Sequence, residues 1–168
     1  PPMLNVLYNN HIQFFQDDEV IAVLAEMNHN ARMVRMNDDP LPAEMNPWLS
    51  DSVGHWEGDT LVVKTTNFHP QNSVRSAIRH YLYLQPDSEV VERFTRVADD
   101  VIHYEFTVTD PDLFTQPWTA EMPLWRTDEN IYEYACHEGN YALPGILAGA
   151  RRKEMEAVQM EKSDQADG

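Results

Sequence analysis

The sequence predicts an all-β protein: an antiparallel up-and-down barrel, lipocalin-like, of about 8–10 short strands, followed by one C-terminal α-helix. Short runs rich in β-branched and aromatic residues recur along residues 1–141, with polar turn residues between them. After Tyr141 the spacing of apolar residues changes to that of a helix. A sheet with this many strands generally curls and closes, because closure removes its unpaired edges. A two-sheet sandwich is the alternative architecture.

The first half of the chain reads as a series of strands separated by polar breaks. We expect strands at residues 11–16, 20–27, 31–36 and 61–67, with a long proline-rich loop at 37–52. Gly58, in the string E-G-D-T, predicts a hairpin turn because glycine accepts the backbone dihedrals that such a turn requires. Residues 73–84 fit either a short helix or an irregular strand, and we favour the strand.

The second half predicts two further hairpins. Residues 89–97 and 101–109 form the first, and a pairing of Val97 with Val101 places Arg93 opposite Glu105 and Thr95 opposite His103.

The second hairpin consists of strands at 118–126 and 131–137, joined across residues 127–130. The predicted division is a barrel domain at 1–141 and, at 142–168, a helix packed on the barrel with a frayed tail.

Composition limits the partners of this chain. Acidic residues number 28 against 12 basic ones, a formal net charge of -16, and such a surface repels the phosphates of nucleic acids. No apolar run approaches the roughly 20 residues that span a bilayer, so we expect no membrane insertion. The expected partner is a small molecule, and a homo-oligomer stays open.

Residues 131–141, with the sequence I-Y-E-Y-A-C-H-E-G-N-Y, carry the strongest candidate for chemistry. On a strand, Glu133 and His137 share one face, and histidine suits acid–base work because its pKa is close to neutrality. Glu121 lies on the neighbouring predicted strand, roughly opposite Cys136. We therefore predict His137 as the catalytic acid or base, with Glu121 or Glu133 as its carboxyl partner. The sequence alone does not tell which strand face lines the cavity.

Substrate binding is predicted from ionisable and aromatic side chains on strands that would otherwise be apolar. His103 and Tyr104 lie on opposite faces, and Tyr104 is the better candidate for the cavity as a phenolic donor. Arg93 either forms an ion pair with Glu105 or orients a substrate carboxylate. The remaining candidates are a polar cluster at the bend after the second strand and two aromatic residues: Glu26, His29, Arg32, Trp118 and Tyr134.

The sequence favours chemistry without a metal or other cofactor. The seven histidines show no H-x-H or H-x-x-x-H spacing. Cys136, His137 and Glu138 cannot all face one ion from a strand, and for the same reason His137 is poorly placed to activate Cys136 as a nucleophile.

Several long strings resemble a large family of uncharacterised bacterial proteins. They are Y-N-N (8–10), W-E-G-D-T-L-V-V-x-T-T-N-F (56–68), V-E-R-F-T-R (91–96), Y-E-F-T-V-x-D-P (104–111), P-W-T-A-E-x-P (117–123) and the string at 131–141. Lys64 departs from the glutamate expected at its position. The resemblance implies an exported protein, periplasmic or secreted, while a cytoplasmic location stays open. It implies no activity that can be carried over residue by residue.

The leading functional hypothesis is therefore a metal-independent acid–base enzyme, a lyase, isomerase or hydrolase, acting on a small, partly aromatic substrate in a barrel cavity. The first alternative is a lipocalin-like carrier of an apolar molecule without catalysis. The second is a structural or interaction domain whose barrel is filled.

Overall fold

The computed structural model describes residues 2–3, 8–71, 73–77, 80–135, 138–139 and 141–166. For 73–77, 80–83 and 161–166 it describes the backbone alone. The chain divides into two units, residues 1–134 and 135–168.

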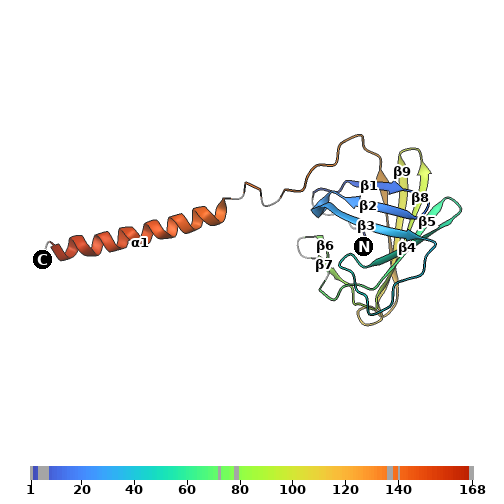
Figure 1. Ribbon diagram of the computed structural model, residues 1–168, viewed down its shortest axis with the longest axis horizontal. Coiled ribbons are helices and arrows are strands. Elements are labelled where there is room, and N and C mark those ends of the chain that lie inside the picture. The colour runs from blue at the N-terminus through green and yellow to red at the C-terminus, as the bar shows by residue number, and fades with distance from the viewer. Residues whose placement is uncertain are drawn as a thin grey trace. The chain divides into compact units, whose positions relative to one another are not determined.

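The first unit contains one curled eight-stranded sheet that forms a half-barrel (Figure 1). Its strands lie in the order β1-β2-β3-β4-β5-β8-β9-β10. Their bounds are β1 Ile12–Gln16, β2 Val20–Ala25, β3 Asn30–Met36, β4 Asp51–Glu57, β5 Thr60–Thr66, β8 Glu89–Ala98, β9 Val101–Thr109 and β10 Trp118–Trp125. A separate hairpin consists of β6 Ser73–Ala77 and β7 His80–Tyr83, and a short 3-10 turn, η1 Met27–His29, precedes β3. The prediction of a mostly β, barrel-like fold with a C-terminal helix is confirmed.

The expected up-and-down connectivity fails at two places. β3 and β4 pair in parallel, with Val34 opposite Ser52, and β5 pairs with β8 because the β6–β7 hairpin lies outside the large sheet. The sheet also remains open: in the described part of the chain no ladder joins β1 to β10, so these two strands are its edges.

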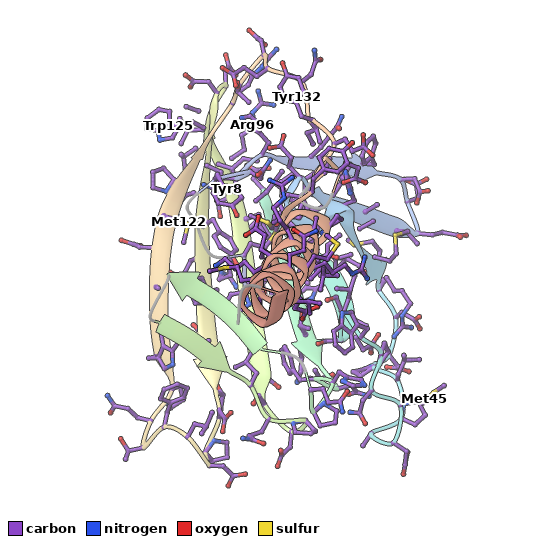
Figure 2. The ribbon with its side chains drawn as sticks, turned by 90° about the vertical axis from the view of Figure 1, so that its left-hand side faces the viewer. Tyr8, Met45, Arg96, Met122, Trp125 and Tyr132 are labelled. Atoms are coloured by element: carbon purple, nitrogen blue, oxygen red, sulfur yellow. The ribbon has the colours of Figure 1, made fainter. Side chains whose placement is uncertain are left out.

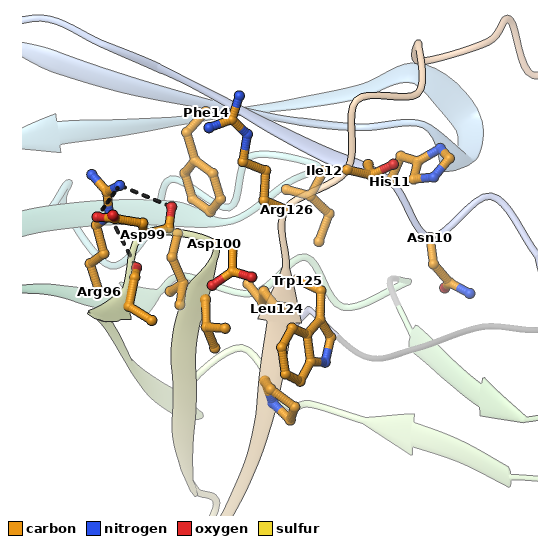
Figure 3. A pocket seen from close by; sticks show the side chains of 15 residues that line it. Asn10, His11, Ile12, Phe14, Arg96, Asp99, Asp100, Leu124, Trp125 and Arg126 are labelled. Carbon is orange, nitrogen blue, oxygen red and sulfur yellow. Dashed lines mark hydrogen bonds and ion pairs between the residues drawn. The ribbon is translucent and has the colours of Figure 1, made fainter.

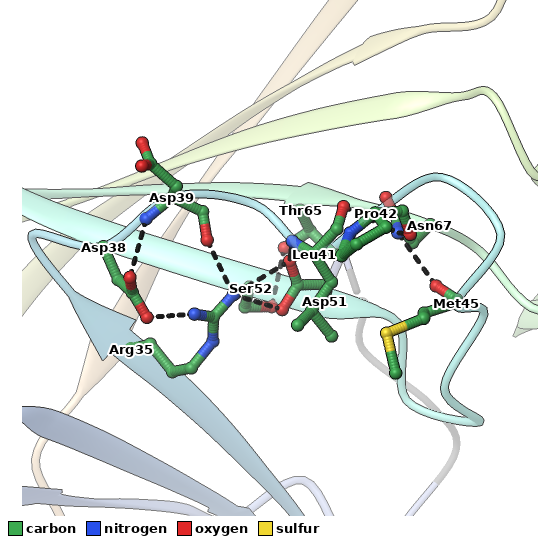
Figure 4. A network of polar contacts seen from close by, with 10 residues as sticks. All are labelled: Arg35, Asp38, Asp39, Leu41, Pro42, Met45, Asp51, Ser52, Thr65 and Asn67. Atoms are coloured by element: carbon green, nitrogen blue, oxygen red, sulfur yellow. Dashed lines mark hydrogen bonds and ion pairs between the residues drawn. The ribbon is translucent and has the colours of Figure 1, made fainter.

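The parallel pair is held by the loop at residues 37–50, which carries the chain back to the start of β4. The buried carboxylate of Asp51 accepts hydrogen bonds from Arg35 Nη2 at 3.0 Å and from the Leu41 backbone N–H at 2.8 Å (Figure 4). Asn67 Nδ2 donates to the carbonyls of Pro42 and Met45, each at 2.8 Å. The side chains of Asp51 and Asn67 thus form hydrogen bonds with backbone groups of the loop, which have no neighbouring strand to pair with.

Gly54 on β4 permits the close approach of the same two strands. A Cβ atom at this position would lie 2.8 Å from Val34 Cγ1 on β3. A larger residue would therefore force the parallel pair apart.

The core lies on the concave face of the half-barrel, where alternate residues of the strands are apolar. Its buried members are Ile21, Val23, Val34, Leu61, Val63, Phe68, Leu84, Val90, Phe94, Tyr104, Phe106 and Val108. Phe94 stacks on Tyr104 with ring centroids 4.7 Å apart, which joins β8 to β9 across the sheet.

The register predicted for the β8–β9 hairpin is confirmed at Arg93 opposite Glu105 and at Thr95 opposite His103. Near the turn, Val101 pairs with Ala98 instead of Val97, because the ladder shifts by one residue between Arg96 and Ala98.

The predicted strand at 131–137 is wrong for residues 131–135, which belong to no strand, while Cys136 and His137 lie outside the described residues. β10 pairs with β9, with Glu121 opposite Glu105. The expected juxtaposition of Glu121 with Cys136 falls on a residue outside the described part of the chain and stays a prediction. The backbone N–H groups of Tyr132 and Tyr134 donate instead to the side chains of Glu26 and His29.

The second unit contains helix α1, Ala142–Ala166, as the spacing of apolar residues after Tyr141 predicts. Pro144 lies in its first turn, where the missing N–H removes no helical hydrogen bond. Among the described residues, no helix has the length and apolar character to cross a bilayer. Packing of this helix on the barrel stays a prediction.

Candidate functional site

A pocket of about 510 Å³ lies between the two edges of the half-barrel, at the end where β8 turns into β9 (Figure 3). Its volume falls within the range of about 300–1,000 Å³ that is typical of small-molecule sites. Three segments far apart in the chain line it: residues 10–14 on the β1 side, 96–102 around the β8–β9 turn, and 123–127 at the end of β10. The pocket exists because the sheet does not close.

The walls of this seam pocket are mostly apolar. Ile12 and Phe14 project from β1 toward Leu124 of β10 (Figure 3). Ile102 of β9 also lines the pocket. These four side chains are partly buried and pack against the core. Trp125 lies at the opening and is 68% exposed.

Charged side chains form the rim of the pocket. Arg96 Nη2 donates to the Asp99 carbonyl at 2.9 Å, and the Arg126 backbone N–H donates to the Asp100 carbonyl at 2.8 Å. Figure 2 shows Arg96 and Trp125 at the same end of the half-barrel as Tyr132, with Met45 at the other end. The Arg126 guanidinium is largely exposed, so it can reach a ligand at the opening.

His11 supplies the titratable ring in the pocket wall. Its Nδ1 lies 3.1 Å from Glu26 Oε2, and the Glu26 side chain is only 4% exposed. The same carboxylate accepts hydrogen bonds from the Tyr132 backbone N–H at 3.0 Å and from Asn9 Nδ2 at 2.7 Å. These bonds, that of Tyr132 first and that of His11 second, lower the pKa of Glu26 below its ordinary value. Glu26 is therefore an ionised, immobile acceptor for the His11 ring.

The environment of this pair distinguishes it from similar contacts elsewhere in the described residues. His55 lies 3.2 Å from Glu57, and His103 lies 3.1 Å from Glu121, but in both pairs all side chains are substantially exposed. Neither pair lines the seam pocket. Of these three described pairs, only that of His11 combines a buried carboxylate with a position in the pocket wall.

The predicted catalytic residues lie elsewhere. Glu121 is 68% exposed, and its Oε2 contacts His103 Nε2 on the outer face of the sheet. Glu133 is exposed in the segment that follows β10, and His137 lies outside the described residues. The pocket lining includes neither glutamate, and the catalytic roles of all three residues stay predictions.

The residues predicted to bind substrate divide between the two faces of the sheet. Arg93 is on the outer face of the sheet, where its Nη2 contacts Glu57 Oε2 at 2.8 Å. Arg93 therefore forms its ion pair with Glu57 of β4 and not with the expected partner, Glu105. Tyr104 is fully buried on the inner face, as expected from alternation. Trp118 is half-buried and packs edge-on against Phe106.

The predicted cluster at the bend after β2 also separates. Glu26 and His29 hold the segment after β10, since His29 Nε2 accepts a hydrogen bond from the Tyr134 backbone N–H at 2.7 Å. Arg32 points into the half-barrel, where its Nη1 pairs with Glu92 Oε2 and its Nη2 lies 3.2 Å from Glu92 Oε1.

Arg32, Glu92 and Tyr104 form a buried polar triad. Tyr104 Oη–H donates to Glu92 Oε1 at 2.7 Å. Burial is the largest single influence and raises the pKa of Glu92, but the charge and hydrogen bonds of Arg32, with a smaller effect of the Tyr104 hydrogen bond, together hold that pKa below its ordinary value. Burial, with the nearby Glu92 charge, raises the pKa of Tyr104, so the phenol stays protonated. The triad is therefore an ion pair with a neutral phenol attached.

Two residues of these clusters were not predicted, His11 and Glu92. A signal for Glu92 is present in the sequence, because Val90, Glu92 and Phe94 share one face of a strand whose apolar members must be buried. His11 precedes β1 and lacks such a signal, because its role depends on Glu26 and on the far edge of the sheet.

The described residues contain no group of three or more His, Cys, Asp or Glu placed to hold a metal ion. Comparison of the chain with protein-family models, with curated proteins and with solved structures found no match in any of the three.

Proposed function

We propose that this chain binds a small, partly aromatic molecule in the seam pocket and acts on it by general acid–base catalysis, with His11 as the proton-transferring group. The observation that carries the proposal is the His11 ring in the pocket wall, oriented by the buried carboxylate of Glu26. The proposed reaction class is unchanged from that predicted from the sequence, a metal-independent lyase, isomerase or hydrolase, but His11 takes the acid–base role that was predicted for His137.

The orientation of the ring assigns a role to each nitrogen. Glu26 is ionised and accepts hydrogen bonds only, so Nδ1 of His11 carries the proton that it donates. In the neutral ring Nε2 then has a free lone pair and acts as the base. Glu129 Oε2 lies 3.6 Å from this nitrogen, but that side chain is 71% exposed and can move aside for a ligand.

The pocket walls suggest the substrate class. Phe14 and Trp125 provide aromatic surface, and Ile12, Ile102 and Leu124 provide aliphatic surface. A flat ring with one polar substituent fits this arrangement, with the substituent toward the charged rim.

A lipocalin-like carrier is the second candidate. The apolar walls and the open half-barrel favour it, because both are sufficient for binding without proton transfer. The two candidates share the pocket and differ in turnover alone.

A Kemp elimination tests the proposal with a defined probe, 5-nitrobenzisoxazole. In this reaction a base takes the proton from C3, the N–O bond breaks, and the electron pair ends on a phenolate oxygen whose absorbance is measured. A correctly placed base contributes about 10²–10⁴-fold, so His11→Ala should lower kcat/KM by at least about tenfold. His55→Ala and His103→Ala are matched controls, since both remove a histidine paired with an exposed carboxylate.

Turnover by the wild type that survives in His11→Ala, or that is lost only in His137→Ala, would overturn the role of His11. Quenching of Trp125 fluorescence by the probe, with turnover no faster than that of free imidazole, would instead establish the carrier.

A further inference from the structure

A second polar site lies inside the half-barrel, formed by the triad of Arg32, Glu92 and Tyr104. None of these three residues lines the seam pocket. Arg32 comes from β3, Glu92 from β8 and Tyr104 from β9, so the fold brings together residues separated by 60 positions to build it. Burying an ion pair is costly, and replacing it with apolar residues is often neutral or stabilising. Stability alone therefore gives no reason for a charged triad in this place.

The interior next to the triad is filled by a segment of the chain itself. The Met3 backbone N–H donates to Tyr104 Oη at 2.9 Å, a contact between residues 101 positions apart. Pro2 is buried, and the half-buried Met3 side chain packs against the core. The dipeptide Pro2–Met3 therefore supplies a backbone N–H to the triad and an apolar side chain to the core.

The hydrogen bonds of the triad determine what it accepts. The Glu92 carboxylate only accepts, so Tyr104 must use its single proton toward Glu92. Toward the interior the same oxygen presents a lone pair, and it therefore selects a donor such as an amide N–H. The apolar surroundings select an apolar group next to that donor.

We propose that this interior is a binding site for an extended peptide segment that places a backbone N–H on Tyr104 Oη and an apolar side chain against the core. In the structure the site is occupied by Pro2–Met3 of the same chain, and a separate peptide of the same chemistry competes with them. This site is independent of the seam pocket and of any reaction there.

Mass action gives the size of the competition. If the internal segment occupies the site nine-tenths of the time, about one-tenth of the molecules are free to bind, and the apparent Kd of an added peptide is raised about tenfold. Met3→Asp removes the competitor, because the Met3 side chain packs against the apolar core and a carboxylate is costly to bury there. The triad itself is untouched by this substitution.

The test uses the full chain and a fluorescently labelled peptide that copies residues 1–8, with binding followed by polarisation. Met3→Asp should bind it about tenfold more tightly than the wild type. Met33→Asp, which changes an exposed methionine on β3, should bind like the wild type. Tyr104→Phe in the Met3→Asp background should lose the gain, because the ring stays and the accepting oxygen is removed.

Equal affinity in Met3→Asp, Met33→Asp and the wild type would overturn the proposal, as would tight binding that survives Tyr104→Phe. Hydrogen exchange provides a second measurement on the unmutated interior: the Met3 amide should be protected in the wild type and lose protection in Tyr104→Phe. An unprotected Met3 amide in the wild type would also refute it. His11 is intact in all these variants, so the Kemp elimination reports separately on the seam pocket.

Discussion

Replacing Arg32 by methionine should destabilise the half-barrel severely. Arg32 is 7% exposed and its partner Glu92 is fully buried, so the substitution leaves a carboxylate in the interior with only the Tyr104 hydroxyl for compensation. Breaking a buried pair by removing one partner costs about 3–5 kcal/mol. That is a large part of the roughly 5–15 kcal/mol that stabilises an ordinary domain, and it corresponds to a fall in Tm on the order of 10 °C.

The assay is thermal and urea denaturation followed by circular dichroism at pH 7, with two matched variants. Arg32→Met combined with Glu92→Gln should recover most of the loss, because no charge is buried and the glutamine oxygen still accepts from Tyr104. Arg93→Met breaks the exposed pair with Glu57, and it should change Tm little since solvent screens that pair.

The pKa of Glu92 also predicts how the difference in Tm between the wild type and Arg32→Met changes with pH. In the wild type the pKa of Glu92 is lowered, so its contribution is present above the ordinary glutamate pKa of 4.5 and is lost as pH falls through the lowered value. In Arg32→Met the unpaired buried carboxylate has a raised pKa, and protonation relieves the penalty as pH falls. The gap in Tm between the two proteins should therefore narrow from pH 7 to pH 4. A gap that does not change with pH, or an Arg32→Met protein as stable as the wild type at pH 7, would refute this reasoning.

Two further predictions concern Glu26, which holds His11, and Gly54, where β4 contacts β3. Glu26→Gln weakens the acceptor that His11 and Tyr132 share. Hydrogen exchange of the Tyr132 amide should therefore become faster, and kcat of the Kemp elimination should fall by a larger factor than KM changes. Unchanged exchange would exclude Glu26 as the anchor of the segment after β10. Its lowered pKa places the Glu26 contribution above pH 4.5, and the Tm difference from wild type should shrink as pH falls. Gly54→Ala should cost about 1–3 kcal/mol in urea denaturation, because the new Cβ meets Val34 Cγ1. Combining it with Val34→Ala should cost less than the sum of the two single changes, and strict additivity would show that this contact is not the cause.

Local chemistry in the sequence determined most of the strands and one hairpin register. Gly58 has a positive φ of 59° in the turn between β4 and β5, as expected from the string E-G-D-T. Alternation along residues 101–109 placed Tyr104 inside and His103 outside, because successive side chains of a strand point to opposite faces. These features depend on neighbours within a few residues, which a sequence displays directly.

The tertiary structure alone decided which strands distant in the sequence pair and which polar groups meet. The parallel contact of β3 with β4, the open seam beside β1 and the path of residues 131–135 all depend on segments that meet across long loops. Glu26 and Arg32 were predicted to act together, but Glu26 anchors His11 and the segment after β10, while Arg32 pairs with Glu92. The free energy of such contacts comes from burial and from partners up to 106 residues away, for which local periodicity carries no signal.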